Sequence, residues 1–320
     1  SAFQTHRIDI ARRSLDTYIA EGGAKLGAAS FWRAMGKLDA GEWESAEIDL
    51  ARAYEDSSSS YRDVALMGWA LSLERRSAYD QAIELLEKFR REFPSSNLLR
   101  EVNVRFASLS LRRGNPRRTL ALLAETEPDT RTRQEYALLG PEAAMRLGEY
   151  AQAQVGFETF VQRFPNSRFA RRARFGAGTA IVKRGDFATA QTVFDSLGVG
   201  SDSLAYAALY TSGVLALLQD RTIDAEARFA SLTDRSPYDP YAEQAYFQLG
   251  LSNYRARHYR DARRFFQLAA RMFPESRNRA NSSRMLGETN VALGESSNAQ
   301  FAFSQVRRLN AGDELIAPAM

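Results

Sequence analysis

The chain has 320 residues, of which 44% are hydrophobic and 26% charged, and its formal net charge is +4, as in a folded and only mildly basic protein. Cysteine is absent, which excludes disulfides and thiolate zinc sites. The sequence also has no apolar run long enough to cross a membrane.

The first predicted element is a helix over residues 8–20, which a pair of glycines ends. Within it, Ala11, Leu15 and Tyr18 have the spacing found in the second helix of the repeats described below. We therefore predict that residues 1–23 form a partial N-terminal repeat or a capping helix, packed against the next helix.

From residue 24 onward one pattern recurs. The motif "GEYAQA" recurs with variations. Its last position is alanine in all repeats but one, which has threonine: Ala46, Ala82, Thr119, Ala153, Ala190, Ala225, Ala262 and Ala299. Four residues later stands a large apolar residue, and twelve residues earlier stands another mostly small one. A period of about 34–37 residues is typical of a solenoid built from two-helix repeats.

Each position of the repeat has a packing role. Apolar residues at 3.6-residue spacing predict two amphipathic helices per repeat, and the Gly or polar pair predicts the turn between them. The two small positions predict a close crossing of these helices. The Phe-Pro of "FPSS", "FPNS" and "FPES" predicts the end of the second helix, and the Ser or Asn after it predicts a cap for the next. The fold class is therefore all-α.

Three places depart from the pattern. Pro116 and Thr222 stand where other repeats have an aromatic residue, so the third and sixth repeats match poorly. Gly140-Pro141 falls inside the first helix of the fourth repeat, where proline costs about 3 kcal/mol. It predicts a kink, or a helix that begins at Pro141, or a functional hinge. The run "GVGSDS" at 198–203 predicts a longer loop.

These residues resemble the tetratricopeptide repeat family, best at residues 64–98, 135–169 and 244–278. The resemblance implies a right-handed superhelical solenoid of about eight repeats over residues 24–310, followed by a C-terminal tail over 311–320. The run "FVQRFPNSRFARRA" is similar to repeats of the bacterial envelope type, found in TolA-binding proteins and outer-membrane-assembly lipoproteins.

For function, the resemblance implies a scaffold or adaptor that binds a partner protein or peptide in a concave groove. It implies a periplasmic or cell-envelope location, with the cytoplasm as the alternative. The last residues, "NAGDELIAPAM", are too short and too broken by Gly and Pro for a full capping helix. Uncapped ends predict either self-association or a longer protein of which this solenoid is a regulatory portion.

Four positions of each first helix face the ligand in this family. The residues that we expect to line the groove here are Phe31, Met35, Met67, Phe175, Tyr210, Phe247, Leu251 and Tyr254. Such an apolar and aromatic surface suits an extended or helical segment of a partner, unless neighbouring helices bury it. Chaperone-binding members carry Lys and Asn at positions where this chain has apolar residues such as Phe31 and Met35, so their carboxylate clamp is not expected.

Lysine occurs only at positions 25, 37, 88 and 183, so nearly all of the 43 basic residues are arginines. Two clusters stand out, and their members are Arg112, Arg113, Arg117, Arg118, Arg168, Arg171 and Arg172. They predict either a solvated face with nearby acids or a site for an anionic partner, such as nucleic acid or another polyanion.

Nothing in the sequence points to catalysis. The two histidines, His6 and His258, are far apart, and neither pairs with a second histidine one helical turn away. The sequence has no phosphate-binding glycine loop and no nucleophile elbow. We therefore predict no enzyme activity, no metal and no cofactor, and we expect His258 to lie in a solvated turn.

Overall fold

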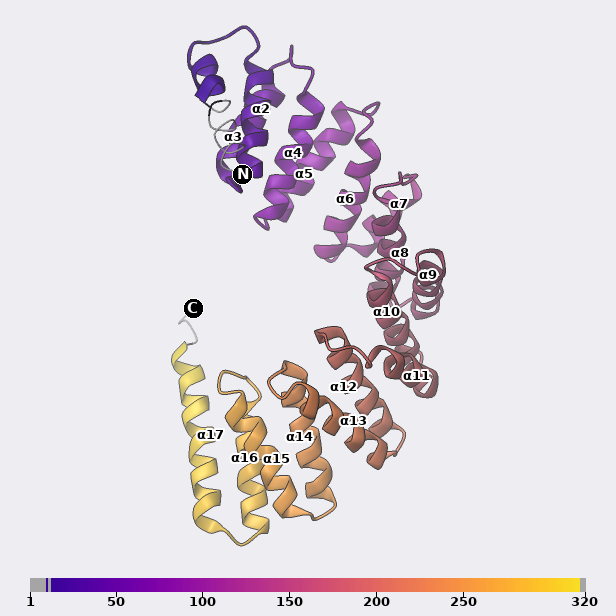
Figure 1. The fold of residues 1–320 in the computed structure, drawn as a ribbon, viewed down its shortest axis with the longest axis vertical. Coiled ribbons are helices and arrows are strands. Elements are labelled where there is room, and N and C mark those ends of the chain that lie inside the picture. Colours follow the sequence, from indigo (N-terminus) through magenta and orange to yellow (C-terminus); the bar gives the residue numbers. More distant parts are fainter. Residues whose placement is uncertain (1–9, 11–12, 317–320) are drawn as a thin grey trace. The chain divides into compact units, whose positions relative to one another are not determined.

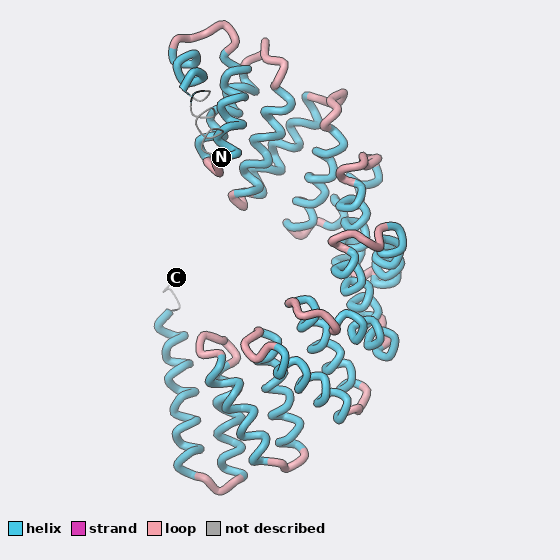
Figure 2. Tube along the Cα trace, viewed as in Figure 1, coloured by secondary structure: helices cyan, strands magenta, loops and turns pink. Residues whose placement is uncertain are grey.

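The structure, a computed structural model, describes residue 10 and residues 13–316, with side chains up to residue 309 (Figure 1). In this part of the chain every regular element is a helix, and Figure 2 shows only turns and loops between the helices. After a helical segment at 13–20, the described chain forms eight helix–turn–helix pairs. They are α2 (Leu26–Asp39) with α3 (Trp43–Glu55), α4 (Arg62–Arg75) with α5 (Tyr79–Glu92), α6 (Leu99–Arg112) with α7 (Pro116–Ala124), α8 (Arg133–Leu147) with α9 (Tyr150–Arg163), α10 (Ala170–Lys183) with α11 (Phe187–Leu197), α12 (Ser203–Leu218) with α13 (Thr222–Arg235), α14 (Pro240–Arg255) with α15 (Tyr259–Met272), and α16 (Arg279–Ala292) with α17 (Ser296–Ile316).

The pairs fall into two compact units, Ser1–Phe164 and Pro165–Met320, with four pairs in each. Within each unit every helix packs against the next one along the chain, and some first helices of neighbouring pairs also touch, such as α12 and α14. The predicted all-α repeat fold is confirmed. A single solenoid over residues 24–310 stays a prediction, and α17 runs on to Ile316, into the stretch predicted as a tail.

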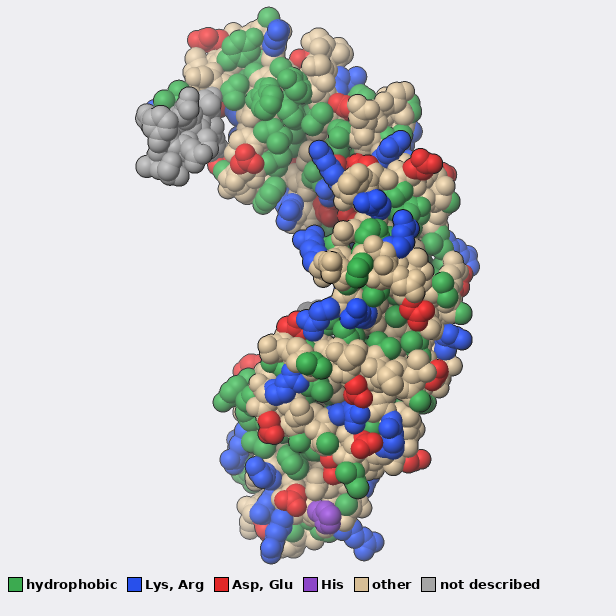
Figure 3. Space-filling model, turned by 45° about the vertical axis from the view of Figure 1, so that its right-hand side comes forward, with side chains coloured by type: hydrophobic (Ala, Val, Ile, Leu, Met, Phe, Trp, Pro, Cys, Tyr) green, Lys and Arg blue, Asp and Glu red, His purple; other side chains and the backbone are tan. Residues whose placement is uncertain are grey.

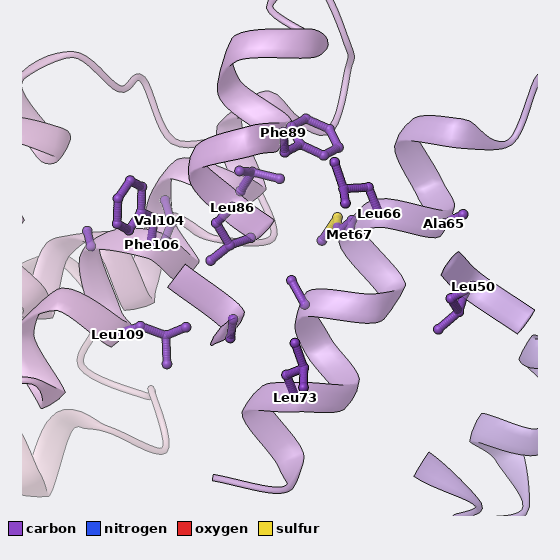
Figure 4. Packing of buried hydrophobic residues seen from close by; sticks show 14 of the residues in the cluster. Leu50, Ala65, Leu66, Met67, Leu73, Leu86, Phe89, Val104, Phe106 and Leu109 are labelled. Carbon is purple, nitrogen blue, oxygen red and sulfur yellow. The ribbon is translucent and has the colours of Figure 1, made fainter. Parts of the chain in front are cut away.

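The small residues that define the repeat lie where the two helices of a pair cross. All eight are buried, with exposed fractions between 0% and 3%. In the third pair the hydroxyl of Thr119 donates a hydrogen bond of 3.0 Å to the backbone oxygen of Ala107, so the two small positions meet directly. The predicted close crossing is therefore confirmed. Figure 4 shows the leucines and phenylalanines that fill the core of the first unit around α4, α5 and α6.

The turn inside each pair has the same backbone shape. One residue, always five positions before the small residue, has a left-handed conformation. The residues are Gly41, Ser77, Gly114, Gly148, Gly185, Asp220, Arg257 and Gly294, with φ between 57° and 85°. Ser77, Asp220 and Arg257 hold this shape without glycine, at a cost of about 1–2 kcal/mol each. The turn geometry is therefore kept even where the sequence loses its glycine.

The Phe-Pro pairs end the second helices as predicted, since α5, α9 and α15 each stop just before the phenylalanine. The serine that follows, Ser96, Ser167 or Ser276, accepts a hydrogen bond of 3.1 Å from the backbone N–H two residues ahead. The N-cap residues of the next helices come later and make no side-chain cap. The prediction that the serine caps the next helix is therefore wrong, because its hydroxyl closes the turn before that helix.

Pro141 lies in the interior of α8, which runs unbroken from Arg133 to Leu147. A helix that begins at Pro141 is therefore a wrong prediction, while a hinge at this place stays a prediction. Pro141 is buried, and α9 approaches it closely, because a methyl group on Gly156 would lie 2.9 Å from the proline Cβ. A loop does connect the end of α11 to Ser203, but the prediction that it is longer than the others is wrong, because the connection from Ala124 to Arg133 between α7 and α8 is longer.

The predicted N-terminal helix is confirmed for residues 13–20, while Ala11 lies outside the described residues. Two contacts tie this segment to the start of the first pair. Asp16 forms an ion pair of 2.9 Å with Arg33 of α2, and the hydroxyl of Tyr18 accepts a hydrogen bond of 3.1 Å from the backbone of Lys25.

Candidate functional site

In the first unit, two of the three residues predicted to line a groove belong to the core. Phe31 is 5% exposed and stacks on Tyr61 with ring centres 4.7 Å apart. Met67 is 6% exposed, and Figure 4 shows it among the buried side chains. Met35 is half-buried against the same core. Phe31 and Met67 therefore do not line an open groove, because neighbouring helices cover them.

In the second unit, the predicted aromatic residues of the first helices are half-buried. Each of three rings rests on the core phenylalanine of its own pair, nineteen residues later in the chain. The ring centres are 5.1 Å apart for Phe175 and Phe194, 5.7 Å for Tyr210 and Phe229, and 5.7 Å for Phe247 and Phe266. One side of each ring therefore contributes to the core, and Tyr210 also packs against Tyr241 of α14, with ring centres 5.9 Å apart.

Two of these rings meet in one pocket. Tyr210 of α12 and Phe247 of α14 line a cavity of about 170 Å³, whose remaining wall comes from α16 with Asn281 and Ser282. The pocket is thus built by the first helices of three successive pairs. Burial raises the pKa of the Tyr210 phenol, and its hydrogen bond with Gln248 offsets part of this effect. The phenol therefore stays neutral and can donate or accept a hydrogen bond at neutral pH.

The last two predicted groove residues lie further along α14. Leu251 lines a larger cavity of about 470 Å³ between α12, α13 and the end of α14. Tyr254 packs edge-on against Tyr259, with ring centres 5.4 Å apart. His258, expected in a solvated turn, is exposed at the start of α15.

Most of the arginines singled out in the sequence contact residues about one repeat away. Three form ion pairs: Arg113 with Asp80, Arg118 with Glu87, and Arg171 with Asp202. Arg112 lies 5.9 Å from the ring centre of Tyr79. Arg168 is 4.5 Å from the ring centre of its neighbour Phe169, and Arg117 and Arg172 are exposed.

These arginines belong to different units, with residues 112–118 in the first and 168–172 in the second. On the face drawn in Figure 3, basic side chains lie among acidic and neutral ones within each unit. The ion pairs neutralise part of the arginine charge within the protein. An anionic-partner site stays a prediction.

The described residues contain no cluster of three or more His, Asp or Glu side chains that could hold a metal ion. A membrane-spanning helix, one long and apolar enough, is not found among the described residues either.

The sequence analysis missed the polar residues of the pocket. Glu243 precedes Phe247 by four positions and therefore lies on the same face of α14. Its exposed fraction is only 6%, unusual for a glutamate. That helical spacing was the signal available in the sequence, but the pocket also takes residues of α16, in another repeat, and no sequence pattern places them beside Glu243.

The family model described as tetratricopeptide repeat matches residues 64–96, 139–167 and 244–276. These segments agree with the three best repeats found in the sequence. No curated protein matches the chain significantly.

Solved structures with the same fold are similar over most of the chain. A tetratricopeptide repeat protein from Parabacteroides merdae is 16% identical, with a TM-score of 0.56 over 83% of this chain and 99% of that one. The C-terminal part of a TPR repeat-containing protein from Cytophaga hutchinsonii is 12% identical, with a TM-score of 0.62 over 79% of this chain and 98% of that one. PilF of Pseudomonas aeruginosa is 17% identical, with a TM-score of 0.50 over 68% of this chain and 96% of that one.

At these identities the structures show the fold alone, while the family model identifies individual repeats. The chain therefore has the helix-repeat fold of tetratricopeptide repeat proteins, and three of its segments match the model of that family.

Proposed function

We propose that this protein is a scaffold that binds a partner protein through an extended or helical peptide segment, and that the segment lies across the first helices α12, α14 and α16 of the second unit. The observation that carries the proposal is the pocket in which Tyr210 and Phe247, from neighbouring first helices, stand beside residues of α16. Aromatic side chains in such a site give a large contact area and commonly dominate the binding energy.

The proposed surface suits a segment of a protein more than a compact ligand. The residues that line the pocket come from α12, α14 and α16, so one chain laid across these helices could contact all three. Leu251 and Tyr254 extend the apolar surface along α14. An extended or helical peptide with spaced apolar side chains matches this arrangement.

We place the protein in the bacterial cell envelope, because its "FVQRFPNSRFARRA" run is similar to repeats of that type. Fractionation of cells of the source organism, with an antibody against the purified chain, tests the location. Recovery in the cytoplasmic fraction alone would contradict it. A regulatory role within a longer protein remains the alternative for the biological setting.

A peptide-binding experiment tests the function. Peptides are selected from a random library on the immobilised chain, and one selected peptide is labelled for fluorescence anisotropy. We expect Tyr210→Ala and Phe247→Ala to weaken its binding by about 1–3 kcal/mol each. Tyr238→Ala is the control, because Tyr238 is 75% exposed in the same unit and does not line the pocket.

Two results would contradict the proposal. One is full affinity in the Tyr210→Ala, Phe247→Ala double variant with normal helical content. The other is a failure of the chain to select any peptide while it binds heparin or single-stranded RNA with a steep salt dependence, which would favour the arginine clusters as an anionic-partner site.

A further inference from the structure

The pocket between α12, α14 and α16 contains two buried oxygen atoms that lack a hydrogen-bond partner. Glu243 is 6% exposed and Ser282 is 0% exposed. The Glu243 Oε1 and the Ser282 Oγ make no hydrogen bond to any described residue, and both residues line the pocket. Burial of a carboxylate oxygen without a donor is unfavourable. The site is therefore complete only when something else supplies hydrogen-bond donors.

The charge of the pocket points to a cation. Among the residues that line it, all within the described part of the chain, only Glu243 carries a charge. The rest of the polar lining consists of Gln244, Gln248, Asn278 and Asn281, whose amide oxygens can accept further hydrogen bonds, and of Ser282. A group with one positive charge and several N–H donors satisfies such a lining, whereas an anion would be repelled by Glu243.

The helix dipole explains only part of this arrangement. Glu243 lies in the first turn of α14, where a negative charge is favoured. The start of α14 is already capped, because the Asp239 carboxylate accepts a hydrogen bond of 2.8 Å from the backbone N–H of Tyr241. The dipole also leaves the unpartnered hydroxyl of Ser282 unexplained, since that residue belongs to α16.

The aromatic walls fit the same ligand. Tyr210 and Phe247 stand in the pocket beside Glu243. Aromatic rings attract ammonium and guanidinium groups, and they also pack against the aliphatic stem of lysine or arginine. With a volume of about 170 Å³, the pocket offers room for one side chain and not for a folded element.

We propose that this pocket binds one basic side chain, lysine or arginine, of the partner segment, with Glu243 as its counter-ion and Ser282 as a further hydrogen-bond acceptor. The inference rests on the proposed function, because it names the residue that the partner presents to this face. A lysine ammonium offers three donors and an arginine guanidinium offers five in a planar fork that suits a carboxylate.

The test uses small compounds on the isotope-labelled full chain. Acetyl-lysine amide and acetyl-arginine amide are titrated while backbone amide resonances are followed. Acetyl-norleucine amide and acetyl-citrulline amide serve as the matched uncharged compounds. We expect at least one charged compound to shift resonances near residues 243–248 and 278–282, and the uncharged counterparts to leave them unchanged. Equal shifts from both kinds of compound, or no shifts from either charged compound, would overturn the proposal.

Variants make the test specific to the carboxylate. Glu243→Gln keeps the shape of the side chain and removes its charge, so we expect it to weaken the binding of the charged compound about tenfold or more. Glu275→Gln is the control, since Glu275 is an exposed glutamate in the turn before α16. Circular dichroism checks the fold of each variant. If Glu243→Gln does not fold, Ser282→Ala takes its place, with a smaller loss expected. Unchanged affinity in the folded variant refutes the role of the pocket.

The same peptide as in the function test separates the two proposals. Its basic residue is replaced by citrulline or norleucine. Affinity that still depends on Tyr210 and Phe247 but not on the basic residue would leave the scaffold function standing and overturn the basic-side-chain pocket. Binding of acetyl-arginine amide that depends on Glu243, in a chain that selects no peptide, would support the pocket and contradict the scaffold function.

Discussion

A glycine of the first helix and a phenylalanine of the second helix are complementary in volume within each of the last four pairs. A methyl group added to Gly213 would lie 2.5 Å from the ring of Phe229, and one added to Gly250 would lie 2.6 Å from the ring of Phe266. The first three pairs have alanine and leucine at these places, for example Ala34 and Leu50. The same helix crossing is therefore packed in two ways. Where the first helix has the smaller glycine in place of alanine, the second helix has the larger phenylalanine in place of leucine.

The first residue-scale prediction tests this complementarity. Gly250→Ala should lower the free energy of unfolding by up to about 2 kcal/mol, because overpacking against Phe266 costs about 1–3 kcal/mol and the better helix propensity of alanine returns about 1 kcal/mol. Phe266→Leu alone should also destabilise, because it leaves a cavity. The double variant should lose less unfolding free energy than the two single variants together. Urea unfolding of the wild-type chain, both single variants and the double variant measures this coupling.

Gly68→Ala is the matched control. Gly68 is also a helix-interior glycine, but a methyl group there would lie 3.2 Å from the flexible end of Leu50 and not against a phenylalanine ring. Its substitution should therefore cost less than Gly250→Ala, because the leucine can shift and alanine favours the helix. Strictly additive losses in the Gly250→Ala, Phe266→Leu double variant would show that the two positions do not share the crossing.

At the scale of helices, arginine side chains connect neighbouring repeats. Arg228 of α13 reaches back to Asp195 of α11, with distances of 2.9 Å and 2.8 Å from its Nε and Nη2 to the two carboxylate oxygens. The buried hydroxyl of Ser212 on α12 donates to the same carboxylate at 2.5 Å. Three successive helices thus share one charged cluster. The ion pairs of Arg76, Arg113 and Arg263 span similar sequence distances. Such contacts give the arginines a structural role.

Asp195→Asn tests the stabilising role of this cluster. Burial alone would raise the pKa of Asp195, but hydrogen bonds from Arg228 and Ser212 outweigh it and lower the pKa. A carboxylate with a lowered pKa stabilises the fold above its ordinary pKa, and this stability is lost as the pH falls through the lowered value. Because the carboxylate is partly exposed, we expect a loss of only about 1 kcal/mol at neutral pH.

The pH dependence makes this prediction specific. The difference in unfolding free energy between the wild-type chain and Asp195→Asn should be largest at neutral pH and should shrink as the pH falls below about 4. Asp234→Asn is the control, since Asp234 is exposed at the end of α13, the helix that carries Arg228. A difference between wild type and Asp195→Asn that stays constant from neutral to acidic pH would mean that the charge of Asp195 does not stabilise the cluster.

For the molecule as a whole, the repeats were predictable because they depend on contacts close in sequence. Ala262 and Phe266 lie one turn apart on one helix, and their partner Gly250 lies twelve residues before Ala262, so their spacing is readable in the chain. The pocket was not predictable, because Glu243 and Ser282 belong to different repeats and their approach depends on how α14 and α16 pack. Phe31, predicted to line a groove, belongs to the core because Tyr61, from the following repeat, stacks on it.

The last prediction concerns how far along the chain a local substitution lowers the stability. In a repeat array each pair contacts mainly its neighbours, so stability is close to a sum of local terms. Ala262→Leu should overpack the crossing of α14 and α15, where Ala262 is 0% exposed, and cost about 1–3 kcal/mol. Hydrogen exchange should then become faster in α13 to α16 and stay unchanged in α2 to α5 of the first unit.

Ala153→Leu, at the equivalent position between α8 and α9, should give the reverse pattern, with faster exchange in the first unit. If either variant accelerated exchange equally in both units, the chain would unfold as one cooperative block, and if neither lowered the stability, the repeat register assigned from the small residues would be refuted.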